Sequence, residues 1–153
     1  MIVKSILVAD DMTESSRAAL EEAVDLSKTF RAKLTIVTVV SAIAPGFAIP
    51  APLGDAFDAI LTETDKRLAA QRERILALGV PEVETKLYQG DPVDRVVEYA
   101  KEHRPDLIVV GSRGLTGAGR FLLGSVSDGI LHHVSCSVLV VKGPTKPDSR
   151  TNP

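Results

Sequence analysis

Two glycine-containing motifs near the C-terminal end of the chain are the residues best suited to chemistry. Gly-Ser-Arg-Gly at 111–114 follows the apolar run 107–110, and Gly-Ser-Val-Ser at 124–127 comes nine residues later, ahead of the run 138–141. Glycines that leave a strand, and a Gly-Ser pair that begins a helix, present free backbone N–H groups of the kind that bind phosphate. The spacing therefore predicts a phosphate-binding loop with a nucleotide as its ligand.

The apolar runs on either side of these motifs belong to a regular alternation of strands and helices. Short apolar runs rich in β-branched residues predict strands at 2–9, 34–40, 83–88, 107–110 and 138–141, and apolar residues at helical spacing predict four helices between them. Such an alternation implies right-handed crossovers and a parallel sheet with helices on both faces. Ligands of these sheets bind at the carboxyl ends of the strands, where the strand order reverses.

The helix boundaries and faces are read from capping residues and periodicity. Asp11 with Glu14 three residues later predicts a capping-box start for the first helix, whose inward face contains Leu20, Ala23, Val24, Ser27 and Phe30. A second helix from about 55 to 78 is predicted to pack through Phe57, Ile60, Leu61, Thr64, Leu68, Gln71, Ile75 and Leu78. Gly79 would end it, and the proline-rich segment 41–54 before it is predicted to be a loop.

Length and composition favour one globular domain in a reducing compartment. The chain has 153 residues, 44% of them hydrophobic, which suits a domain over 1–143 followed by a disordered tail at 144–153. Twenty acidic and eighteen basic side chains are interspersed and give a net charge of -2, which argues against nucleic acid as a partner. A single cysteine, Cys136, and the absence of a leader or a long apolar run predict a cytoplasmic protein with no membrane association.

The glycine spacing, together with Ile-Leu-Val-Ala-Asp-Asp at 6–11 and Cys-Ser-Val-Leu-Val-Val at 136–141, resembles the universal stress protein family over residues 2–142. The resemblance implies an α/β, Rossmann-like (adenine nucleotide alpha hydrolase-like), doubly wound sheet of five parallel strands in the order 3-2-1-4-5, with four helices. Family members that carry these glycines bind ATP. The resemblance thus implies an ATP-binding regulatory protein of the stress response, with little or no turnover and with ATP bound with or without Mg²⁺.

The motifs and the resemblance together give the candidate nucleotide contacts, which are Ala9, Asp11, Val39, Gly111, Arg113, Gly114, Gly124, Ser125, Val126 and Ser127. The glycines let the backbone approach phosphate oxygens without a Cβ in the way. The hydroxyls of Ser125 and Ser127 can donate to phosphates, and the guanidinium of Arg113 can offset their charge. No residue is assigned a catalytic or metal-binding role.

The two adjacent aspartates are given different roles. Asp11 matches the family's acidic residue at the end of the first strand and is expected to accept from ribose hydroxyls, and Asp10 is taken as its exposed neighbour. The backbone of Val39 is expected to meet adenine. Helix capping is a second reading for Asp11, and also for Ser125, which has Asp128 three residues later.

Two other functions are open from the residues. A slow ATPase or nucleotidyl transferase would share the architecture, but the Walker pattern is absent and no lysine lies between 111 and 137. A signalling receiver domain would use Asp10 and Asp11 as an acidic pair, but Gln89 and Gly90 stand where its phosphoacceptor aspartate belongs. The last strand, 138–141, carries no charge that would protect a sheet edge, so pairing with a second copy is expected, and the resemblance implies the same homodimer.

Overall fold

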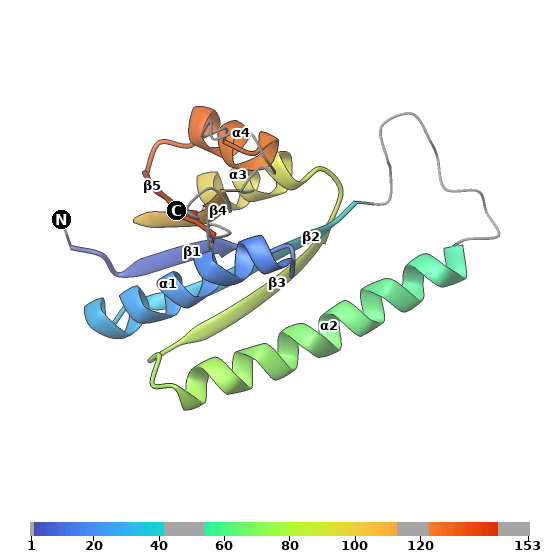
Figure 1. Cartoon of the computed structure of the whole chain (residues 1–153), viewed down its shortest axis with the longest axis horizontal. Coiled ribbons are helices and arrows are strands. Elements are labelled where there is room, and N and C mark those ends of the chain that lie inside the picture. Colours follow the sequence, from blue (N-terminus) through green and yellow to red (C-terminus); the bar gives the residue numbers. More distant parts are fainter. Residues whose placement is uncertain (1, 42–53, 113–122, 144–153) are drawn as a thin grey trace, which may run out of the picture.

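A five-stranded sheet with helices on both faces is formed by residues 2–41, 54–112 and 123–143, the part of the chain that this computed structural model describes (Figure 1). The strands are β1 (Ser5–Ala9), β2 (Lys33–Val40), β3 (Val83–Gln89), β4 (Leu107–Ser112) and β5 (Ser137–Lys142), and the helices are α1 (Glu14–Phe30), α2 (Gly54–Ala77), α3 (Pro92–His103) and α4 (Ser125–His133). The strand order is β3-β2-β1-β4-β5, and every neighbouring pair is parallel. The predicted topology is confirmed.

Alternate residues of each strand serve two separate cores. In β1, Ile6 and Val8 pack in the core beneath α1 and α2, whereas Leu7 packs in the core beneath α3 and α4. The same alternation holds in β4, where Val109 belongs to the first core and Ile108 to the second. Because both faces of the sheet are covered, the strands read as uninterrupted apolar runs rather than as alternating polar and apolar residues.

The start of α1 differs from the prediction. Its N-cap is Thr13, whose hydroxyl accepts from the backbone N–H of Ser16 at 3.4 Å, so the capping role assigned to Asp11 is wrong. Between the strand and the helix, Met12 adopts the left-handed conformation, with a φ of 61°. The helix cap therefore lies at Thr13, two residues after the predicted position at Asp11. At the other end of the helix, Phe30 is 46% exposed and does not join the core as predicted.

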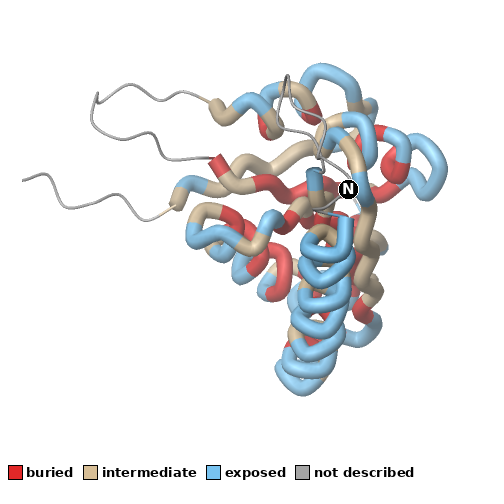
Figure 2. Tube along the Cα trace, turned by 90° about the vertical axis from the view of Figure 1, so that its right-hand side faces the viewer, coloured by how far each residue is buried: buried red, intermediate tan, exposed pale blue. Residues whose placement is uncertain are grey.

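The long helix α2 is anchored by only part of its predicted face. Leu68 and Ile75 are buried, but Ile60 and Leu78 are 52% and 53% exposed. The 24 residues of α2 span about 36 Å, whereas the seven residues of β3 span about 23 Å, so the first turns of the helix extend past the sheet (Figure 1). These turns are mostly exposed (Figure 2). Gly79, with a φ of 98°, follows the helix as predicted. No helix among the described residues combines the length and apolar character needed to cross a membrane.

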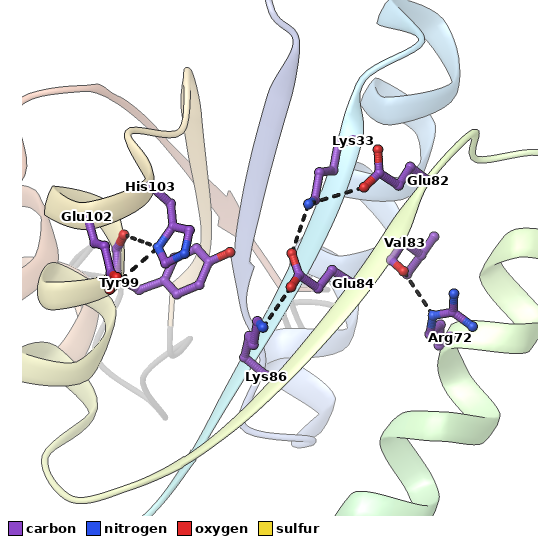
Figure 3. Close-up of polar contacts among 9 residues, drawn as sticks. All are labelled: Lys33, Arg72, Glu82, Val83, Glu84, Lys86, Tyr99, Glu102 and His103. Carbon is purple, nitrogen blue, oxygen red and sulfur yellow. Dashed lines mark hydrogen bonds and ion pairs between the residues drawn. The ribbon is translucent and has the colours of Figure 1, made fainter.

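Charged side chains gather on β3, at one edge of the sheet, and on its neighbour β2 (Figure 3). The Arg72 side chain of α2 donates to the carbonyl oxygen of Val83 at 2.9 Å. Lys33 and Lys86 approach the Glu84 carboxylate at 2.9 Å and 2.7 Å, and their hydrogen bonds lower the pKa of Glu84. This edge is therefore protected against pairing with another strand, in contrast to β5 at the opposite edge, whose four central residues are all apolar.

The first turn of α1 lies against the end of β4. The Ser15 hydroxyl donates to the carbonyl oxygen of Ser112 at 2.8 Å. A Cβ on Gly111 would lie 2.8 Å from the backbone oxygen of Ser15, closer than real contacts allow. Gly111 is thus required for this packing, a reason separate from the ligand approach inferred from sequence.

At the opposite end of the sheet, Asp106 joins the start of β4 to the start of β1. Its carboxylate accepts from the backbone N–H groups of Lys4 and Ser5 at 2.8 Å and 2.9 Å, and from the Ser5 hydroxyl at 3.1 Å. The two backbone donors hold the pKa of Asp106 below its ordinary value.

Replacing Gly111 with alanine tests the close packing of α1 on β4. Because the clashing partner is a backbone atom that cannot rotate away, we expect Gly111→Ala to lower the free energy of unfolding by about 1–3 kcal/mol in urea titrations. Gly54→Ala is the matched control, since a Cβ there meets no atom within 4 Å. Equal stability of Gly111→Ala and the wild type would show that α1 does not need this approach.

Replacing Asp106 with asparagine tests the charged tether between β1 and β4. A carboxyl with a lowered pKa stabilises the fold above its unfolded pKa of about 3.9, and this contribution disappears as the pH falls through the folded pKa. We therefore expect Asp106→Asn to be less stable than the wild type at pH 7, and the difference to shrink below about pH 4. Asp65→Asn, on the exposed side of α2, is the control. A difference that is constant with pH would contradict the role of the charge.

Candidate functional site

One pocket lies at the carboxyl ends of β1, β2 and β4, where the chain switches from one side of β1 to the other. This is the place at which doubly wound sheets bind their ligands. The pocket is lined by seven of the predicted nucleotide contacts, which are Ala9, Asp11, Val39, Gly111, Gly124, Val126 and Ser127. Ser125 is exposed and is not among its lining residues, and Arg113 and Gly114 lie outside the described residues.

Valine side chains on the side of the sheet that carries α3 and α4 form the apolar part of the pocket. They come from β2, α3, β4 and α4, and are Val37, Val39, Val96, Val110 and Val126. Most of these residues also pack in or against the core beneath α3 and α4, so the wall that they make is rigid. A wall of this kind suits a flat apolar ring rather than a charged group.

The start of α4 forms the polar side of the pocket. Gly124 is the N-cap and makes no side-chain capping bond, so the cap role considered for Ser125 is wrong. Among the described residues, no side chain caps the first N–H groups of α4, and these groups carry the positive end of the helix dipole. The backbone of Gly124 is extended, with φ -65° and ψ 154°, a conformation open to any residue.

The Ser127 hydroxyl has a different role from the predicted one, which was to donate to phosphates. Its Oγ donates to the carbonyl oxygen of Gly111 at 2.6 Å, and the residue is 4% exposed. A hydroxyl has one proton to donate, so in this structure that proton is not available to a ligand. The bond fixes the first turn of α4 against the end of β4 and so sets the width of the pocket.

Of the two aspartates, Asp10 lies in a different environment from the one expected from sequence. Asp10 is 4% exposed rather than exposed as predicted, and its carboxylate accepts from the Met12 N–H at 2.8 Å, the Ser16 hydroxyl at 2.6 Å and the Gln71 amide at 3.1 Å. Asp11 is exposed at the pocket, and accepts from the Thr13 N–H at 3.0 Å. Both carboxylates thus shape the turn from β1 into α1.

Sequence reasoning missed Asp10 as a structural residue, although a signal was present. Ile6, Val8 and Asp10 occupy alternate positions of one extended segment, so all three face the side of the sheet that carries α1 and α2. No group of histidine, cysteine, aspartate or glutamate in the described ranges is arranged to hold a metal ion. Both carboxylate oxygens of Asp10 accept from protein donors.

Comparisons with known proteins give the family. The sequence profile of the universal stress protein family matches residues 3–142. The universal stress protein UspA from Lactobacillus plantarum is 28% identical, with a TM-score of 0.80 over 92% of this chain and 99% of that one. A universal stress protein solved in complex with cAMP is 30% identical, with a TM-score of 0.65 over 94% of this chain and 100% of that one.

A third solved structure adds another bound nucleotide. A universal stress protein family protein from Arabidopsis thaliana with AMP bound is 26% identical, with a TM-score of 0.68 over 95% of this chain and 97% of that one. The profile match covers nearly the whole sheet and its helices. This match, together with the strand order and the pocket at the switch point of the sheet, shows that the chain belongs to the universal stress protein family.

Proposed function

We propose that this chain is a regulatory protein of the stress response that binds ATP in the pocket between β1, β2 and β4. The observation that carries the proposal is the pairing, in one pocket, of an apolar valine wall with the uncapped start of a helix. An adenine ring needs the first surface and a chain of phosphates needs the second. A pocket that bound only an apolar ligand would not need the N–H groups of a helix start.

The polar residues fit the remaining parts of a nucleotide. The exposed carboxylate of Asp11 can accept from ribose hydroxyls, and the backbone of Val39 lies at the end of β2 to meet the base. The N–H groups that follow Gly124 can hold phosphate oxygens. Arg113 and Gly114 remain in the proposal through their place in the sequence, between β4 and α4.

The bound nucleotides of the relatives support the adenine nucleotide class. One relative is described with cAMP and another with AMP, and both match more than nine-tenths of this chain. Within that class, we propose ATP, with or without Mg²⁺, as the ligand. A cytoplasmic location, favoured by the single cysteine, likewise remains a proposal.

The chemistry that the described part of the pocket offers supports little or no turnover. Among its described lining residues, the titratable side chains are Asp10 and Asp11. The carboxylate of Asp10 is enclosed by three donors, and that of Asp11 accepts from Thr13, so neither is positioned as a general base. We therefore favour binding and release over a slow ATPase or a nucleotidyl transferase.

Calorimetric titration with ATP tests the proposed function, and Gly124→Val locates the site. The extended backbone of Gly124 accommodates valine, so the fold should persist while the new side chain blocks the approach of phosphates. We expect ATP to bind the wild type, and the affinity of Gly124→Val to fall by about tenfold or more, which corresponds to about 1.4 kcal/mol.

Gly54→Val provides the matched control for this titration, because Gly54 also lies at the start of a helix but far from the pocket. Its affinity for ATP should equal that of the wild type. No binding heat with the wild type, and no nucleotide extracted from the purified protein, would reject the proposed function.

We further propose a homodimer formed along β5. This strand pairs with β4 on one side, and its central residues Val138, Leu139, Val140 and Val141 are all half-buried, without a charge. Light scattering coupled to gel filtration should give the mass of a dimer. A monomer at micromolar concentration would contradict the pairing.

A further inference from the structure

A second hollow lies between α1 and α2, beside the pocket described above, with which it shares Asp10 and Thr13 as lining residues. It has a volume of about 620 Å³, against about 80 Å³ for the pocket. The hollow exists because α2 rests on the sheet through Leu68 and Ile75, while the residues that it turns toward α1 include the small Ala70 and the polar Gln71. The two helices, which lie on the same face of the sheet in Figure 1, therefore leave a groove between them.

Three arginines line this groove, which we call the arginine groove. Arg67 and Arg74 come from α2, and Arg17 comes from α1 on the opposite side. Arg67 and Arg74 are seven residues apart, so they lie on the same side of the helix about 10 Å from each other. The guanidinium groups thus occupy both walls of the groove over about two helical turns.

The charges of these arginines are largely unused within the described part of the chain. Neither Arg67 nor Arg74 has an ion pair with a described residue, although Glu63 stands four positions before Arg67 in α2. Arg17 pairs with Glu21 at 3.3 Å, but both side chains are about 70% exposed, so this pair contributes little to stability. Arg72 of the same helix shows the contrast, since it holds the Val83 carbonyl and Glu73.

Two carboxylates also face the arginine groove, and they leave a positive surplus. Asp10 is enclosed by the donors of Met12, Ser16 and Gln71. Glu14 stands in the first turn of α1, where the helix dipole favours a negative charge. The lining residues thus hold three guanidinium groups and two carboxylates, a surplus of one positive charge that favours an anion over a cation.

We propose that the arginine groove binds an oligophosphate, a linear chain of phosphoryl groups. A guanidinium group pairs with phosphate oxygens through two parallel hydrogen bonds, which favours phosphate over other anions. The separation of Arg67 and Arg74 along α2 suits an extended anion better than a single phosphate ion. The groove adjoins the nucleotide pocket, but its three arginines do not line that pocket, so the proposal does not depend on nucleotide binding.

Two-dimensional NMR of the ¹⁵N-labelled full-length protein, titrated with sodium tripolyphosphate at constant ionic strength, tests the proposal. We expect saturable shifts of the backbone amides of α1 and α2 that line the groove. Amides at 124–127 report separately on the nucleotide pocket, so failure of one site is distinguishable from failure of the other. Orthophosphate should bind the groove at least about tenfold more weakly than tripolyphosphate.

Paired charge variants make the NMR test specific. Arg67→Gln with Arg74→Gln should weaken tripolyphosphate binding in the groove by about tenfold or more, while the spectrum stays that of a folded protein. Lys66→Gln with Lys101→Gln removes the same charge from exposed positions outside the groove and should leave binding unchanged. The proposal is overturned if the groove amides do not shift, if both double variants bind alike, or if orthophosphate binds as tightly as tripolyphosphate.

Discussion

A buried carboxylate at the end of the central strand is the constraint on which the geometry of the site depends. Burying a charge costs several kcal/mol unless hydrogen bonds replace its water. Asp10 receives those bonds from the turn at Met12, from α1 at Ser16 and from α2 at Gln71. Its backbone joins β2 as well, because its N–H donates to Val37 at 2.9 Å and its carbonyl accepts from Thr38 at 2.7 Å. One residue thus connects four elements around the pocket.

The positions of α1 and α4 at the pocket depend on this junction at Asp10. The turn held by Asp10 places the first turn of α1 against the end of β4, which is possible because Gly111 has no side chain. The carbonyl of the same glycine receives the Ser127 hydroxyl and so positions α4. The valine wall and the start of α4 therefore line one pocket, whose borders are set by hydrogen bonds within the protein.

The sequence was sufficient to predict the fold, and most of the candidate site, because these features depend on patterns within short segments. Apolar runs such as 107–110 predict strands buried on both faces, and their alternation with helices leaves few possible strand orders. Features that depend on residues distant in sequence were not predictable. The contact between Gly111 and Ser15 is one case, and the overshoot of α2 beyond the sheet, which exposes Ile60, is another. The burial of Asp10 was missed because its place in the strand alternation was not read, and the capping role of Asp11 was wrong because Met12 moves the cap to Thr13.

A crystal structure of the protein with ATP would test the central claim, that the pocket at the switch point of the sheet holds an adenine nucleotide. The account predicts density for adenine against Val39 and Val126, and phosphates at the N–H groups that follow Gly124. An empty pocket at millimolar ATP, or a nucleotide bound elsewhere on the molecule, would contradict it.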